Sequence, residues 1–227
     1  MDAALRHRAT ALLRQSPWLE GERASLIEPL IAHGRLIRLK AGQWAQSEGD
    51  DDTGLLVVVE GMVQLLCQAP GDREVLLGQA GPGVAIGQTI RFGGGPRLVT
   101  VVCAQDSLVL QVSDRALGRI AAEHPGIWEA VAALLYLQLR GLVQMVAVAT
   151  ALPPRQRLAA RLEALARASP GGASLRLSQQ ALAEMIGLTR KTVNAYLGEF
   201  ERAGLVRRAY GALTVLDAPG LRRIAER

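Results

Sequence analysis

The chain has 227 residues and a formal net charge of +5, with 49% hydrophobic and 21% charged residues. This composition excludes an intrinsically disordered protein, and the length is sufficient for two domains with separate cores. We expect no membrane-spanning segment, because no run of apolar residues approaches the roughly 20 that a span needs. The charged, amphipathic N-terminal segment also differs from a signal peptide, so the sequence predicts a cytoplasmic protein without a membrane partner.

The positive charge is concentrated in the last third of the chain. Residues 151–227 contain 13 Arg and Lys against 6 Asp and Glu, whereas residues 1–150 contain 13 against 15. Such a basic segment favours contact with phosphates, because neutralised phosphates release counterions. The two cysteines, Cys67 and Cys103, lie in apolar runs, which predicts buried thiols rather than a disulfide or a metal site.

The first half of the chain is predicted to contain two helices followed by short strands. Helical apolar spacing covers residues 3–15 and 22–32, and a period of two begins at Arg35. Further strands are predicted at residues 55–61, 62–68, 73–81, 98–105 and 107–113. This spacing is typical of a small antiparallel barrel or sandwich. The acidic triplet from Asp50 to Asp52 is interpreted as a solvated turn rather than a metal site.

A long helix is predicted over residues 126–149, after a short one over residues 114–123. One set of side chains in the long helix repeats at the spacing of a two-helix coiled coil. These residues are Trp128, Val131, Leu135, Gln138, Leu142, Met145 and Ala149. We expect them to form a homodimer interface, while a second face with Leu134, Leu137 and Val148 lies against the β region of the same subunit. The alternative is a single broad core face within one subunit.

Residues 178–197 are predicted to form a helix-turn-helix. Ser178 and Thr189 are suited to cap the two helices, and Gly187 is suited to the turn between them. Val193 and Leu197 fall on one face of the second helix, which leaves its polar residues for other faces. The alternative is a pair of amphipathic helices that only pack in a core, but the basic charge around the motif favours DNA binding.

The motif is flanked by a helix over residues 155–167 and a hairpin over residues 205–216. Pro153 and Pro154 separate this helix from the long one. The hairpin reads as a wing, whose arginines Arg207 and Arg208 are suited either to the DNA backbone or to solubility. The predicted base-reading residues are Arg190, Lys191 and Asn194, and the predicted phosphate contacts are Gln179, Gln180 and Arg208. Thr189 and Thr192 complete the candidate DNA surface.

With this order of elements, nearly the whole chain resembles the CRP/FNR family of bacterial transcription regulators. The resemblance is carried by KAGQWAQSEGDDDTGLLVVVEGMVQLL, by GPGVAIGQ with PRLVTVV, and most specifically by LSQQALAEMIGLTRKTVNAYLGEFERAGLV. It implies an α+β fold with a cyclic-nucleotide-binding-like β-roll over residues 1–125. A dimerisation helix over residues 126–151 and a winged helix-turn-helix over residues 152–227 would follow.

The resemblance also implies where an effector would bind, and there the sequence departs from the cyclic-AMP pattern. The family pattern has Gly-Glu at the start of a short helix and then Arg-Ser or Arg-Thr, where this chain has Gly87-Gln88 and Arg97-Leu98. The dimer-helix positions that supply hydroxyls to the base are Leu142 and Val143. We therefore expect that cyclic AMP is not the ligand, and that the pocket binds another effector or is vestigial.

The sequence does not favour the other sensor chemistries of the family or other classes of protein. The cysteines are too few for an iron–sulfur switch, and three scattered histidines do not predict a haem, so no cofactor or metal is expected. The sequence contains no Ser/His/Asp set, no metal-ligand cluster and no GxxxxGK[ST] phosphate-binding loop that would indicate an enzyme. The expected partners are double-stranded DNA, a second copy of the chain and RNA polymerase. The rival hypothesis is a small-molecule-binding module whose winged helix contacts proteins.

The second helix of the motif also departs from the family pattern for TGTGA-type half-sites. In that pattern Arg-Glu is followed four residues later by Arg. Arg190 keeps the first arginine, but Lys191 replaces the glutamate and Ala195 replaces the second arginine. A lysine donates where a carboxylate accepts, so the sequence predicts a different half-site that still contains the guanine read by Arg190.

Overall fold

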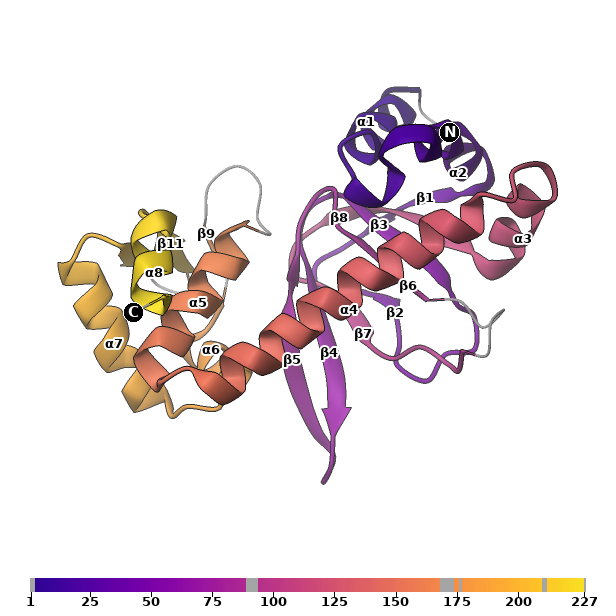
Figure 1. Ribbon diagram of the computed structural model, residues 1–227. Coiled ribbons are helices and arrows are strands. Elements are labelled where there is room, and N and C mark those ends of the chain that lie inside the picture. Colours follow the sequence, from indigo (N-terminus) through magenta and orange to yellow (C-terminus); the bar gives the residue numbers. More distant parts are fainter. Residues whose placement is uncertain (1–2, 89–93, 168–173, 176, 210–211, 227) are drawn as a thin grey trace. The chain divides into compact units, whose positions relative to one another are not determined.

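The structure is a computed structural model that describes residues 3–88, 94–167, 174–175, 177–209 and 212–226 (Figure 1). Its chain divides into two compact units. The first comprises Met1–Cys67 and Ala80–Gly141, and the second comprises Gln68–Gln79 and Leu142–Arg227. The division falls within the long helix α4, Ile127–Ala151, which therefore contributes residues to both units.

The first unit begins with a small group of helices. These are α1 (Ala3–Leu13), the 3₁₀ helices η1 (Pro17–Leu19) and η2 (Gly21–Leu26), and α2 (Ile27–His33). The two predicted helices are confirmed, although the second begins as a 3₁₀ helix. Their apolar residues Leu13, Leu30 and Ile31 are each at most 2% exposed, because they pack into the core beneath the first β-sheet.

Two four-stranded sheets form the body of this unit. The first sheet has the order β1-β8-β3-β6 and the second has the order β2-β7-β4-β5. Their bounds are β1 Arg35–Leu39, β2 Trp44–Gln46, β3 Gly54–Glu60, β4 Val63–Ala69, β5 Arg73–Ala80, β6 Ala85–Gln88, β7 Thr100–Cys103 and β8 Ser107–Ser113. The antiparallel pairing confirms the expected barrel or sandwich. The sequence did not predict β2 and β6, which are too short to show a clear period.

Strand β3 places alternate residues in two separate cores. Leu55, Val57 and Val59 lie in the core that contains the helices. Leu56 and Val58 lie in the second core, with Val101 and Cys103 of β7. This alternation follows from the two-residue period of a strand and explains the uninterrupted apolar run that the sequence shows. Cys103 is buried as predicted, whereas Cys67 is partly exposed.

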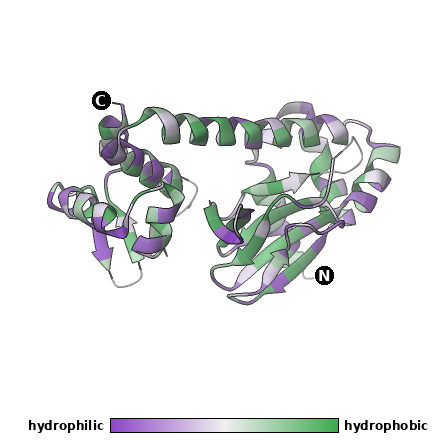
Figure 2. Cartoon of the chain, turned by 90° about the horizontal axis from the view of Figure 1, so that it is seen from below, coloured by the Kyte–Doolittle hydropathy of each residue, from purple (hydrophilic) through white to green (hydrophobic). Residues whose placement is uncertain are grey.

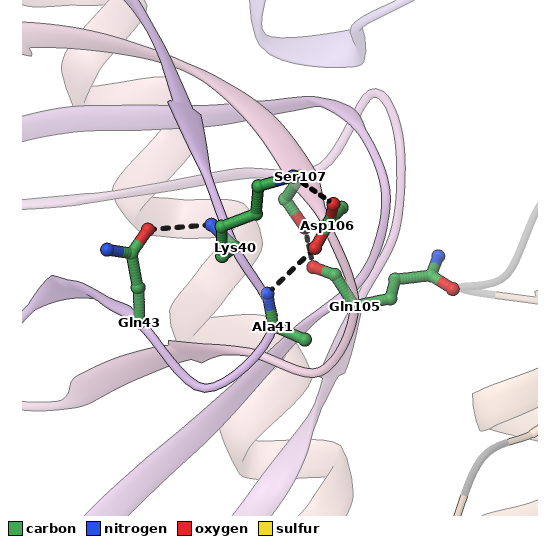
Figure 3. A network of polar contacts seen from close by, with 6 residues as sticks. All are labelled: Lys40, Ala41, Gln43, Gln105, Asp106 and Ser107. Atoms are coloured by element: carbon green, nitrogen blue, oxygen red, sulfur yellow. Dashed lines mark hydrogen bonds and ion pairs between the residues drawn. The ribbon is translucent and has the colours of Figure 1, made fainter.

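A polar network closes one end of the β-roll (Figure 3). Asp106, just before β8, accepts hydrogen bonds from Lys40 Nζ at 2.8 Å and from the backbone N–H of Ala41 at 3.0 Å. Gln43 Oε1 accepts from the backbone N–H of Lys40 at 2.7 Å, so the turn after β1 is held from both sides. These hydrogen bonds, with that of Lys40 first, lower the pKa of Asp106 and keep its carboxylate ionised.

Helix α3, Asp114–Glu123, leads into α4, which has apolar residues along its whole length (Figure 2). Ile127, Ala130 and Leu134 are buried in the first core, and Leu137 packs against it, which confirms the predicted face at Leu134 and Leu137. Helix α4 is long and apolar enough to cross a membrane by length and composition alone. Its uninterrupted apolar runs are short, as the sequence analysis found, because polar and charged residues interrupt them.

In the described part of the second unit, one helix and three strands surround a helix pair, and a further helix follows at the C-terminal end. Its elements are α5 Pro154–Arg167, β9 Ser174–Leu175, α6 Gln179–Met185, α7 Arg190–Arg202, β10 Val206–Ala209, β11 Ala212–Val215 and α8 Ala218–Ala225. The strands form one antiparallel sheet in the order β10-β11-β9, which confirms the hairpin; its predicted turn at 210–211 lies outside the described residues. Helix α8, which the sequence did not predict, packs against α5.

Phe200 is fully buried in the core of this unit, so its truncation should destabilise the unit strongly. We expect Phe200→Ala to lower the free energy of unfolding by about 3–5 kcal/mol, through lost apolar burial and the cavity that remains. The measurement is the urea midpoint of the transition of the second unit. Leu216→Ala is the matched control, because Leu216 is 48% exposed. A Phe200→Ala midpoint equal to that of the control would contradict the assigned core.

Candidate nucleic-acid interface and effector region

The structure confirms the helix-turn-helix and both of its predicted caps. The side chain of Ser178 accepts a hydrogen bond from the backbone N–H of Ala181 at 3.0 Å, and Thr189 accepts from that of Thr192 at 3.1 Å. Gly187 has a φ of +63°, a left-handed conformation that favours glycine and turns the chain between the helices. Ala183 is 1% exposed, so its small side chain allows the two helices to pack closely.

Helix α7 divides into a buried face and a polar face. Val193, Leu197 and Phe200 are at most 1% exposed, as the helical spacing of the first two predicted. On the other side, Arg190 and Lys191 are exposed at the N-terminal end of the helix. A helix that buries one stripe in this way presents its N-terminal cations to any partner that lies against its outer face.

The remaining predicted base readers and cap residues are partly engaged within the chain. The hydroxyls of Thr189 and Thr192 lie 2.8 Å apart and hydrogen-bond to each other. Asn194 is half-buried, and within the described residues its buried Oδ1 atom has no hydrogen-bond partner. A buried acceptor without a partner is costly to the folded state.

The predicted phosphate contacts differ in their surroundings. Gln179 is half-buried at the start of α6, and Gln180 donates through Nε2 to Glu184 Oε1 at 2.7 Å. Arg208 of β10 is held by Glu201 of α7, with 2.6 Å between Arg208 Nη2 and Glu201 Oε2. The predicted role of Arg208 as a free cation for phosphate therefore does not match its surroundings, because its guanidinium already has an anionic partner.

Two arginines of α5, which the sequence analysis did not identify, stabilise the helix-turn-helix. Arg157 donates through Nη1 to the carbonyl of Ile186 at 3.0 Å, where α6 ends, and through Nη2 to the carbonyl of Leu152 at 3.3 Å. Arg155 pairs with Glu199 of α7 at 3.1 Å and lies over the ring of Phe200 at 5.4 Å. A cation at the C-terminal end of a helix satisfies its free carbonyls, so Arg157 stabilises the turn of the motif.

In the effector region, Arg97 is buried and committed to backbone carbonyls. Its side chain is 9% exposed and donates to the carbonyls of Asp52 at 2.9 Å and Gly54 at 3.2 Å. Burial lowers the pKa of the guanidinium, and the nearby carboxylates of Asp52, Asp50 and Asp114 act in the opposite direction. The group stays charged, and its hydrogen bonds hold the acidic turn against the segment around Arg97.

Arg97 also lines a small cavity of about 100 Å³ beside the acidic turn. The walls of this cavity include Gln46, Thr53 and Gln111. Leu98, next in the chain, is 70% exposed. The arginine that the resemblance assigns to a phosphate thus has a structural role in this conformation.

Gly87 and Gln88 end strand β6 rather than start a helix. The segment in which the expected short helix would begin, residues 89–93, lies outside the described residues, as does the side chain of Gln88. The backbone of Gly87 is bound by Gln138 of α4: Nε2 donates to its carbonyl at 3.2 Å, and its N–H donates to Oε1 at 3.5 Å. A Cβ atom at position 87 would lie 2.4 Å from Leu55 Cδ2, so a larger residue there would force the Leu55 side chain to move.

The predicted seam of α4 needs correction at two positions. Val131 is 2% exposed in the core of its own unit, and Gln138 is bound to Gly87, so neither belongs to an exposed row. The spacing of the sequence fits two overlapping sets that share Leu135 and Leu142, and the first unit covers the two positions of the predicted set at Val131 and Gln138. The exposed large apolar residues of α4 are Leu135, Tyr136, Leu139, Leu142, Val143 and Val146. Four of them (Leu135, Leu139, Leu142 and Val146) alternate at steps of four and three.

No group of three or more His, Cys, Asp or Glu suited to a metal ion occurs among the residues that the structure describes. The acidic triplet is part of a turn, as predicted, because Asp50 Oδ2 accepts from the backbone N–H of Ser47 at 2.8 Å.

Comparisons with known proteins match both halves of the chain. The model of the cyclic nucleotide-binding domain matches residues 36–124, and that of the Crp-like helix-turn-helix domain matches residues 156–224. A CRP-like cAMP-activated global transcriptional regulator of Mycobacterium tuberculosis is 26% identical over 220 residues, which cover 94% of this chain and 98% of the relative.

Solved structures show the same fold. FixK2 from Bradyrhizobium japonicum has a TM-score of 0.72 at 16% identity and covers 84% of this chain and 96% of its own. A CRP/FNR-family transcriptional regulator from Thermus thermophilus has a TM-score of 0.67 at 25% identity, with 85% and 99% covered. With the β-roll, the long helix and the winged helix-turn-helix all in place, the chain belongs to the CRP/FNR family of transcription regulators.

Proposed function

We propose that this regulator acts as a homodimer that binds a specific DNA sequence without needing cyclic AMP. The observation that carries the proposal is the N-terminal end of α7, where Arg190 and Lys191 are exposed on a helix whose opposite face is fully buried. Helices of this kind read base edges in the major groove. As a regulator of transcription it would act in the cytoplasm and contact RNA polymerase.

The DNA-binding role is distributed over the two helices of the motif. Arg190 and Lys191 are proposed to read guanine or thymine edges, and Asn194 to use its unsatisfied amide oxygen, since this acceptor would bond a base donor. Gln179 and Gln180 at the start of α6, together with Thr189 and Thr192, are proposed to face the sugar-phosphate backbone. The excess of basic residues in 151–227 supplies the attraction that does not depend on sequence.

The homodimer is supported by the exposed apolar row of α4. Leu139 is 58% exposed, Leu142 50% and Val146 62%, and such a row facing water is unfavourable on a long helix. The same row on a second copy would cover it with heptad spacing. Leu135 and Ala149 lie at the two ends of this row. Trp128 and Met145, which also belong to the predicted seam, are proposed to lie at the edge of the interface.

The absence of a cyclic-AMP requirement is supported by the contacts of the effector region. Arg97 would have to leave two backbone carbonyls before it could bind a phosphate. Gln138 already connects α4 to β6 through the backbone of Gly87, a connection that an effector would otherwise have to supply. Leu142 and Val143 offer no hydroxyl to a purine. Another effector would have to bind through other groups, such as those that line the cavity beside Arg97.

The test of function is a DNA titration at several salt concentrations, with sites selected from random DNA. We expect the affinity to fall steeply with salt, and Arg190→Ala to weaken binding to the selected site by about 1–3 kcal/mol, since one bidentate base contact is lost. Arg6→Ala, which removes the same charge from the first unit, is the control and should leave binding unchanged. Salt-independent or absent DNA binding would favour the alternative, a winged helix that contacts proteins.

The dimer prediction concerns the exposed row of α4. We expect the double substitution Leu139→Glu and Leu142→Glu to give monomers, because two buried carboxylates in each subunit would face each other across the interface. Sedimentation of the variant and the parent protein measures this. Gln144→Glu, on the opposite face of the same helix, is the control and should remain dimeric. A dimeric double variant would place the interface elsewhere.

The effector prediction concerns cyclic AMP. We expect calorimetry to detect no sub-micromolar binding of cyclic AMP, and the affinity for DNA to be the same with and without the nucleotide. We also expect Gln138→Ala to weaken DNA binding, because α4 loses its hydrogen bonds to Gly87, and to do so without restoring a response to cyclic AMP. Tight cyclic-AMP binding by the parent protein would refute the proposed role of Arg97.

A further inference from the structure

One carboxylate joins the recognition helix to the wing. Glu201, in the last turn of α7, accepts two hydrogen bonds from Arg208 of β10 and forms an ion pair with it. Its Oε1 atom accepts from the backbone N–H of Arg208 at 2.8 Å, and its Oε2 atom accepts from Nε at 2.7 Å. Nη2 of the same guanidinium lies 2.6 Å from Oε2. Charge-assisted bonds of this length are among the stronger ones in proteins.

The backbone bond in this set has a specific structural reason. Strand β10 is at the edge of the sheet β10-β11-β9, so one side of its backbone has no neighbouring strand. Edge strands need another partner for the N–H groups on that side, and Glu201 supplies one at Arg208. The carboxylate therefore fixes the main chain of the wing, and not only a side chain.

The orientation of β10 agrees with this role. Side chains alternate along a strand, so Val206 and Arg208 lie on one side and Arg207 on the other. Val206 is 1% exposed, which places its side of the strand against the core of the unit. Arg208 Nη2 lies 4.0 Å from the position that a Cβ atom of Gly198 would occupy, one turn before Glu201. The arginine thus lies along the surface of α7.

We propose that the Glu201–Arg208 pair is a brace that sets the angle of the wing relative to the recognition helix. This inference rests on the proposed function, DNA binding through α7. Arg208 is then a positioning residue, which acts on DNA through Glu201 and the wing. The role predicted for it from the sequence, a direct phosphate contact, would require it to leave its anionic partner.

The brace persists at neutral pH. The side-chain hydrogen bond from Arg208, followed by the backbone bond, lowers the pKa of Glu201 below its usual range. A carboxylate with a lowered pKa contributes its interaction above its ordinary pKa and loses it as the pH falls through the lowered one. The pair is therefore intact under the conditions in which a regulator binds DNA.

Exchanging the charges of Glu201 and Arg208 distinguishes a brace from a direct phosphate contact of Arg208. We expect Arg208→Glu alone and Glu201→Arg alone each to weaken binding to the selected DNA site, by about tenfold, because each places like charges together. The double variant Glu201→Arg with Arg208→Glu restores an ion pair at unchanged net charge. We expect it to recover affinity to within about threefold of the parent, since only the backbone bond of residue 208 is not replaced.

A direct phosphate contact predicts the opposite results. Glu201→Arg would then strengthen binding, by adding a cation and releasing Arg208, and the double variant would stay as weak as Arg208→Glu, because a glutamate at position 208 repels phosphate. Either result overturns the brace. Glu199→Arg changes the same charge on the same helix, but Glu199 pairs with Arg155 of α5 rather than with the wing, so adding it to Arg208→Glu should not restore the affinity.

Thermal unfolding shows whether the exchange variants fold. If they do not, Glu201→Ala, Arg208→Ala and their double variant give the same answer: a brace makes the double variant no weaker than Glu201→Ala, whereas a phosphate contact makes Glu201→Ala bind more tightly than the parent. Failure of the proposed function is distinct, because the parent protein itself would then show no salt-dependent binding to DNA.

Discussion

Helix α4 has apolar side chains on two faces, and one subunit covers only one of them. Ile127, Ala130, Val131 and Leu134 are buried in the first core, which anchors the N-terminal half of the helix on the β-roll. The row from Leu135 to Val146 has no such cover within the chain's described residues. An apolar row that faces water on a long helix is unfavourable, and this is the feature of α4 that supports the proposed homodimer.

The winged helix-turn-helix holds one short helix, α7, rigidly and leaves the outer face of this helix free. Val193, Leu197 and Phe200 anchor α7 from within, and Arg155 and Arg157 of α5 fix its neighbours through an ion pair and two carbonyls. None of these contacts uses Arg190 or Lys191. Arg190 and Lys191 would therefore be available to DNA, because the charged and polar groups that hold α7 in place are paired with other residues.

Local signals in the sequence predicted much of this architecture. Ser178, Gly187 and Thr189 act as expected because caps and turns depend on neighbours within a few residues. Strand β8 and helix α3 also have the predicted bounds. The pairs Gln138 with Gly87 and Glu201 with Arg208 could not be predicted, because periodicity gives the face of a residue but not the element that packs against it. The same limit explains why Val131 and Gln138 were assigned to the seam of α4.

In the effector region, side chains of the chain itself bind the backbone groups that frame the site. Arg97 is retained in sequence, yet its guanidinium binds the carbonyls of Asp52 and Gly54 and so stabilises the turn before β3. Gln138 binds the backbone of Gly87 from the side of α4. Both contacts are made by the protein itself between the segments that frame the site. An effector that binds the same groups would first have to break these contacts. Otherwise it could bind only to groups that the contacts leave without a partner.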